Sequence, residues 1–131
     1  MSPDEKWARR VVAEVCLDYG IREPEFVWRE SRTKPYASGH CYWGWETRIV
    51  ITAGCPTLPM IPHYKGLTTS VDNRTTVCHE LAHLITRRGH ASNRFWEVDW
   101  ELIRKYRLPI GQSKIREGRK GGGRRAYLAS R

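Results

Sequence analysis

Three residues near the middle of the chain have the types and the spacing needed to hold and use a metal ion. His79 and His83 are four positions apart, which on a helix places both imidazoles on one face, about one turn from each other. Glu80 lies on the adjacent face of the same helix. From there its carboxylate can take a proton from a water that the metal activates. The run His79-Glu80-Leu81-Ala82-His83 therefore predicts one zinc ion, with Glu80 as the general base.

The third ligand of this zinc must come from further along the chain. A catalytic zinc has three protein ligands and one open position. We expect His90 to be the third ligand, because Gly89 can end the helix and let the chain turn back toward the metal. A carboxylate from a following helix also completes such sites, so His90 has three rivals: Glu97, Asp99 and Glu101.

The elements that position these groups follow from the spacing of apolar residues. The histidines lie on a helix that Ser70 or Asp72 can cap and that stops at Gly89, and Ser92 caps a second helix that Pro109 ends. Upstream, the pattern predicts an amphipathic helix, a short strand, and a hairpin or one long bent strand, over residues 4–19, 25–30 and 39–53. We therefore expect an α+β fold with an N-terminal helix, a short and mostly antiparallel sheet, the histidine helix and a following C-terminal helix.

Two segments are expected to border the metal site. Residues 54–70 contain several prolines and indicate a loop that crosses the surface. Trp43 and Trp45 project to one side of a strand, so they line either a substrate groove or the interior. A further donor to a developing oxyanion is also expected, and the candidates are Tyr36, His40, His63 and Tyr64.

The residues around the histidines resemble a known family. The His79–His83 pattern, the pair Gly89-His90 and the pair Phe95-Trp96 are together similar to the zinc-binding core of SprT-like and related minimal metallopeptidases, which are zincins. The resemblance implies a small zincin-like domain in which the three histidines bind zinc and Glu80 is the base for peptide-bond hydrolysis. The substrate would then be a protein or a peptide.

The same resemblance covers about residues 36–103 and implies where a substrate binds. The run Arg48, Ile49, Val50 and Ile51 would lie beside the cleft as an edge strand that pairs with an extended substrate. The metallopeptidase domain would span residues 1–108, and residues 109–131 would be a basic, flexible tail.

Charge is concentrated in this tail. Residues 104–131 contain ten Lys and Arg against one acid, whereas residues 1–103 contain thirteen of each sign. A clustered basic segment is typical of a DNA or RNA partner or of a solubilising extension. The resemblance to SprT-like proteases implies that a nucleic-acid contact would hold the enzyme near nucleic-acid-associated proteins. The expected contacts are Lys114, Arg116, Arg119, Lys120, Arg124 and Arg125.

Cysteine spacing and hydropathy favour a reduced compartment. The four cysteines include no Cys-x-x-Cys pair. No stretch approaches the roughly 20 apolar residues of a membrane span, and the polar N-terminus does not resemble a secretory signal. We expect a soluble, cytoplasmic protein without a membrane partner.

Two other functions fit parts of the sequence. The three histidines without Glu80 are similar to those of YbeY-like metal-dependent endoribonucleases, and a basic tail would suit RNA. A nucleic-acid-binding module with a structural zinc would need a fourth ligand, which Cys41 or Cys55 could supply. Glu80 favours the peptidase, because the ribonuclease chemistry does not need a carboxylate at this position.

Overall fold

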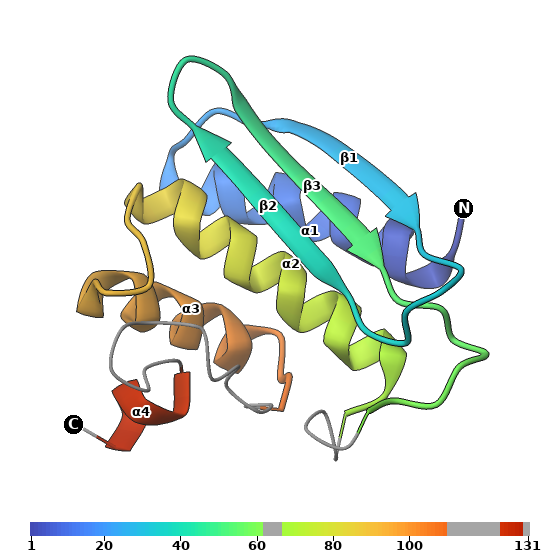
Figure 1. Ribbon diagram of the computed structural model, residues 1–131. Coiled ribbons are helices and arrows are strands. Elements are labelled where there is room, and N and C mark those ends of the chain that lie inside the picture. Colours follow the sequence, from blue (N-terminus) through green and yellow to red (C-terminus); the bar gives the residue numbers. More distant parts are fainter. Residues whose placement is uncertain (62–66, 110–123, 130–131) are drawn as a thin grey trace.

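The chain folds into a small sheet with helices on one of its faces (Figure 1). The computed structural model describes residues 1–61, 67–109 and 124–129. The elements in these ranges are α1 (Pro3–Tyr19), β1 (Glu25–Glu30), β2 (Ser38–Trp43), β3 (Thr47–Ala53), α2 (Thr69–Thr86), α3 (Asn93–Lys105) and α4 (Arg124–Ala129). Helices α1 and α2 cover the sheet, and α3 packs against α2. The expected α+β class, with its N-terminal helix, is confirmed.

Strand β3 is the centre of the sheet, in which the strand order is β1-β3-β2. Strands β2 and β3 form the expected hairpin and pair antiparallel, but β1 and β3 pair in parallel. The sheet is therefore mixed rather than mostly antiparallel, because β3 enters between the two earlier strands. The prediction that residues 48–51 form an edge strand is wrong, since β3 bonds to a neighbour on both sides. The edge strand beside α2 is β2.

Local capping sets the ends of α2. The side chain of Thr68 accepts a hydrogen bond from the first turn, so the helix begins earlier than the expected caps at positions 70 and 72. At the other end, Arg87 adopts a left-handed conformation with φ of 53°, and its N–H donates to the carbonyl of His83 at 2.8 Å. The helix therefore ends before Gly89, which lies in the turn that follows.

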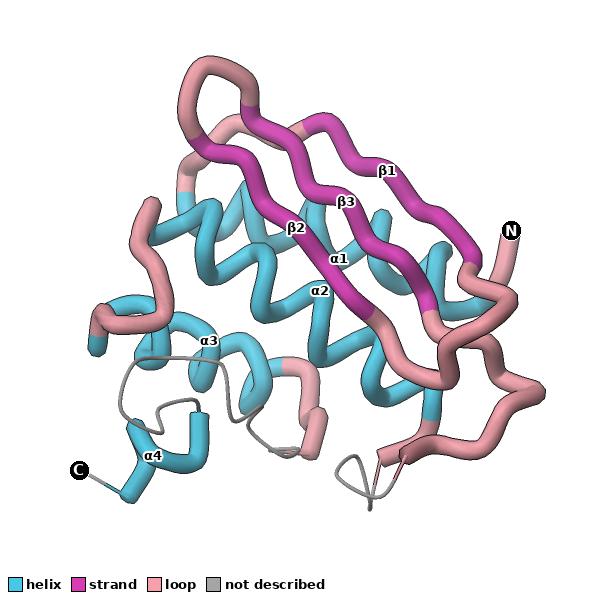
Figure 2. Tube along the Cα trace, in the orientation of Figure 1, coloured by secondary structure: helices cyan, strands magenta, loops and turns pink. Residues whose placement is uncertain are grey.

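Helix α2 also forms the centre of the hydrophobic core (Figure 2). Alternation along β3 directs Ile49 and Ile51 toward the helices. Fully buried side chains from three elements, α1, β3 and α3, surround α2: Val11, Val15, Ile49, Ile51, Phe95, Val98, Leu102 and Ile103. Burial of one such side chain contributes about 1.5–3 kcal/mol, so packing on several sides fixes the helix that carries the histidines. None of the described helices combines the length and the apolar character that a membrane crossing requires.

Helix α4 packs on α3 and adds a buried ion pair (Figure 1). Arg124 is 7% exposed, and its Nε and Nη2 atoms lie 2.5 and 2.9 Å from the carboxylate of Asp99, which is fully buried. Residues 124–129 are therefore folded onto the domain, unlike the flexible tail predicted for 109–131, and Arg124 is not available for nucleic acid. The other predicted contacts are not described, in whole or in their side chains: Lys114, Arg116, Arg119, Lys120 and Arg125.

Candidate metal centre

The three histidines predicted as ligands lie together. The Nε2 atom of His90 is 2.9 Å from the Nε2 atom of His79 and 2.9 Å from that of His83. One ring nitrogen from each histidine lies within 4.8 Å of the other two. Three converging imidazole nitrogens are a ligand set that proteins use for metal ions, catalytic zinc among them. The group could therefore hold a metal ion, as the spacing of the three residues predicts.

The His83 ring is fixed with its Nε2 atom toward the other two histidines. Its Nδ1 lies 2.7 Å from the carbonyl oxygen of Arg88. Because a carbonyl only accepts, Nδ1 carries the proton and Nε2 keeps its lone pair for a metal. The rings of Phe95 and Trp43 stack on His83 at centroid distances of 4.2 and 5.6 Å. Burial lowers the pKa of His83 to about 4, which favours the neutral ring that binds metal.

The turn between α2 and α3 brings His90 back to the helix. Ser92 caps α3 as predicted, and its hydroxyl accepts the Phe95 N–H at 3.5 Å. The indole N–H of Trp96 donates to the His90 carbonyl at 2.7 Å. The start of α3 therefore holds both the backbone of the third histidine and, through Phe95, the ring of His83.

Glu80 is buried against strand β2. The residue is only 4% exposed to solvent. A Cβ atom at Gly39 would lie 2.7 Å from both Cγ and Oε2 of Glu80, so the strand approaches the carboxylate as closely as glycine allows. Burial and, second, the Glu80 charge raise the pKa of Cys41 to about 12. The Glu80 carboxylate is therefore enclosed between α2 and β2, while its role as a base stays a prediction.

The carboxylates that could have replaced His90 are engaged elsewhere. Glu97 forms an ion pair with Arg94, Glu101 accepts the hydroxyl of Tyr19 at 2.7 Å, and Asp99 pairs with Arg124. None of the three belongs to the histidine group. His90 is therefore the residue that the structure brings to the two helical histidines.

In the part of the chain that the structure describes, no fourth residue completes the group. Cys41 and Cys55 are the fourth ligands that a structural zinc would need, but neither belongs to the group. The Cys55 Sγ atom instead lies 3.0 Å from the hydroxyl of Thr57. A set of three ligands leaves a coordination position open, which is characteristic of catalytic rather than structural zinc.

None of the other predicted site residues that the structure describes belongs to the histidine group. Ile49 and Ile51 are fully buried in the core, and Arg48 forms ion pairs with Glu46 and Glu25. His40 is exposed, and its ring centroid lies 4.7 Å from that of Tyr42. Tyr36 lies in the loop before β2, whereas His63 and Tyr64 fall outside the described residues.

Two contributors to the site were not predicted as such. Gly39 contacts Glu80, and a glycine inside a strand is a signal of close backbone approach. Trp43 stacks on His83, but the sequence left open whether it faced a groove or the interior. Only the position of β2 beside α2 decides this.

The chain was also compared with known proteins. No protein-family model, no curated protein and no solved structure matches it. The resemblance to SprT-like metallopeptidases therefore stays a prediction, and the function has to be inferred from the chemistry of the site itself.

Proposed function

We propose that this chain is a zinc-dependent peptidase in which His79, His83 and His90 hold the metal and Glu80 is the general base. The observation that best supports the proposal is the convergence of three imidazole nitrogens on a helix that also carries a buried carboxylate. Three ligands with an open position suit catalysis. Imidazole suits zinc, although it also binds copper, iron and nickel.

The residues around the metal ligands have distinct tasks in this proposal. A zinc ion held by the three histidines would act as a Lewis acid, which would lower the pKa of water and polarise a carbonyl. Glu80 accepts the proton of the attacking water and returns it to the leaving amine. The Arg88 carbonyl fixes the tautomer of His83. Phe95 stacks on the His83 ring, and Trp96 holds the turn through its hydrogen bond to the His90 carbonyl. The enclosed position of Glu80 limits its contact with bulk water.

Strand β2, rather than β3, is the strand with which an extended substrate could pair. It is an edge strand, so one of its sides keeps main-chain groups for another strand. It contacts Glu80 through Gly39 and His83 through Trp43. A peptide paired along β2 would therefore pass beside the metal ligands. Main-chain pairing suits unfolded or extended protein segments of varied sequence.

The basic segment supports a second contact, with DNA or RNA near the protein substrates. We expect the affinity for a nucleic acid to fall steeply with salt, because each neutralised phosphate releases counterions. Replacement of Lys114, Arg116, Arg119 and Lys120 by glutamine should flatten that dependence without changing the metal content. A dependence on salt that is unchanged in this variant would remove the tail from the proposal.

Metal content and cleavage, measured on the same samples, test the main proposal. The proteins are the wild type, Glu80→Gln and His90→Ala, each incubated with an unfolded protein substrate. We expect one zinc in the wild type and in Glu80→Gln, with cleavage only by the wild type. His90→Ala should bind zinc more weakly. Glu97→Gln and His40→Ala are matched controls, because both side chains lie outside the histidine group.

Each contrary result has a specific meaning. Cleavage by Glu80→Gln at the wild-type rate would remove Glu80 as the base. Zinc binding by His90→Ala at the affinity of His40→Ala would remove the third ligand. Zinc-dependent cleavage of RNA, with protein left intact, would replace the peptidase with a ribonuclease, and a wild type that binds no metal would end both proposals.

A further inference from the structure

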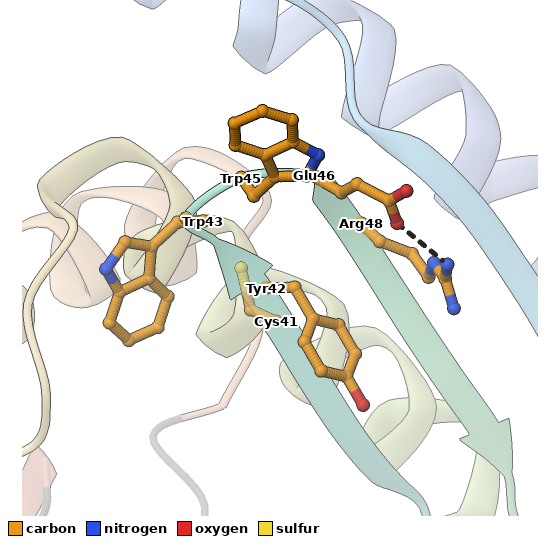
Figure 3. A pocket seen from close by; sticks show the side chains of 7 residues that line it. Cys41, Tyr42, Trp43, Trp45, Glu46 and Arg48 are labelled. Carbon is orange, nitrogen blue, oxygen red and sulfur yellow. Dashed lines mark hydrogen bonds and ion pairs between the residues drawn. The ribbon is translucent and has the colours of Figure 1, made fainter.

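The end of the β2–β3 hairpin carries two aromatic rings that are wholly or half exposed. Trp45 has 101% relative exposure and Tyr42 has 48%. Beside them lies a hollow of about 520 Å³, lined by residues 41–46 and by Arg48 (Figure 3). This hollow is called the hairpin pocket below. Large aromatic side chains gain about 1.5–3 kcal/mol when they are removed from water, so the exposed rings can contribute to the binding of an apolar group.

The charged groups of the hairpin pocket already have partners. The Arg48 guanidinium lies 3.2 Å from the Glu46 carboxylate and 3.2 Å from that of Glu25. It also lies over the ring of Tyr42, 5.7 Å from the centroid. Figure 3 shows the Glu46–Arg48 pair together with the rings of the pocket. Because both charged side chains of the pocket already form ion pairs, the pocket favours an apolar occupant over a charged one.

The hairpin pocket also shares one residue, Trp43, with the surroundings of the candidate metal centre. Trp43 lines the pocket, and its ring stacks on the metal ligand His83 at 5.6 Å. Three of the lining residues, Cys41, Tyr42 and Trp43, belong to the edge strand β2, which also contacts Glu80 through Gly39. An extended peptide advances about 3.3 Å per residue. A peptide along β2 that reaches the metal centre therefore also places a nearby side chain at the pocket.

We propose that the hairpin pocket binds a large apolar side chain, aromatic or aliphatic, of a peptide paired with β2. The side chain belongs to a residue within about three positions of the cleaved bond. This inference rests on the proposed peptidase function and adds the class of substrate to it. Trp45 and Tyr42 supply the exposed contact surface, and Trp43 forms the boundary between the pocket and the metal centre.

Binding can be tested separately from cleavage in the zinc-loaded Glu80→Gln protein. Short labelled peptides carry one Phe, Leu, Lys or Glu in an alanine background, and their affinities are measured by fluorescence anisotropy. We expect the Phe and Leu peptides to bind about tenfold more tightly than the alanine peptide. Trp45→Ala, added to Glu80→Gln, should remove most of this preference. Leu17→Ala is the control, because Leu17 is another large apolar residue, 82% exposed on α1 and outside the hairpin pocket.

The outcomes separate this inference from the proposed function. An unchanged preference in the Trp45→Ala protein, equal binding of the Lys or Glu peptide, or no peptide binding would each overturn the pocket. Wild-type cleavage without an apolar preference would overturn the pocket and leave the peptidase intact. An apolar preference that Trp45→Ala removes, in a protein whose wild type cleaves no peptide, would support the pocket and overturn the peptidase.

Discussion

Replacement of Arg124 by methionine should destabilise the domain strongly, because the substitution leaves the Asp99 carboxylate buried without its cation. Asp99 is fully buried, and Arg124 meets it through two hydrogen bonds of 2.5 and 2.9 Å. Removal of one partner of a buried ion pair costs about 3–5 kcal/mol. A domain of this size loses about 4 °C in Tm per kcal/mol. The expected fall in Tm is therefore roughly 12–20 °C.

Thermal unfolding and urea unfolding of the metal-free protein provide the assay, since a bound metal would add its own stabilisation. Arg94→Met is the matched control. Arg94 pairs with Glu97 at 3.4 Å on the surface, where the two side chains are 55% and 46% exposed, and such pairs contribute about 0–1 kcal/mol. The double variant Arg124→Met with Asp99→Leu should recover most of the loss, because it leaves no unpaired charge in the interior.

Two results would refute this reasoning. If Arg124→Met changed Tm no more than Arg94→Met, the Asp99 carboxylate would have to reach water, and α4 would not shield it from solvent. If the double variant stayed as unstable as Arg124→Met, the loss would come from the packing of α4 and not from the carboxylate.

Two further variants or reactions test the surroundings of the metal centre. Gly39→Ala should abolish most of the proposed cleavage and lower the free energy of unfolding by about 1–3 kcal/mol, because the new Cβ would overlap Glu80. Gly44→Ala is the control, because a Cβ there meets nothing within 4 Å. Equal cleavage by the two variants would contradict the close contact between Gly39 and Glu80. Iodoacetamide at mildly alkaline pH should label Cys55 well before Cys41, because the thiolate is the reactive form. The hydrogen bond with Thr57 lowers the pKa of Cys55, whereas burial raises that of Cys41 to about 12. Peptide mass mapping gives the order, and simultaneous labelling would count against the burial of Cys41.

The grouping of the three histidines could be predicted because the information for it is local. His79 and His83 share a helix face through the periodicity of the α-helix alone. His90 follows after a turn that needs only a few residues. The exact end of the helix was harder to predict, because Arg87 adopts the left-handed conformation there. Such a conformation is unusual outside glycine, so the sequence favoured Gly89.

The strand order and the C-terminal contact could not be predicted in the same way. The apolar alternation of β3 is compatible with a central strand or an edge strand, and only the pairing with β1 and β2 distinguishes the two. The pair between Asp99 and Arg124 joins α3 to a helix from beyond residue 109. Within a strongly basic segment, the charge of Arg124 indicated a surface role, and no local pattern identified its buried partner.

The proposed metal binding and the proposed substrate contact therefore depend on different parts of the chain. The three histidines come from α2 and the turn after it, and α3 supports their rings. The surface that a substrate would meet comes from β2 and the hairpin, which contact the histidines through Trp43 and Glu80 through Gly39. Because Trp45 is exposed and makes neither of these contacts, changes at the hairpin tip can alter which peptide is bound while the histidines keep their positions. The peptide preference should accordingly vary independently of the zinc affinity.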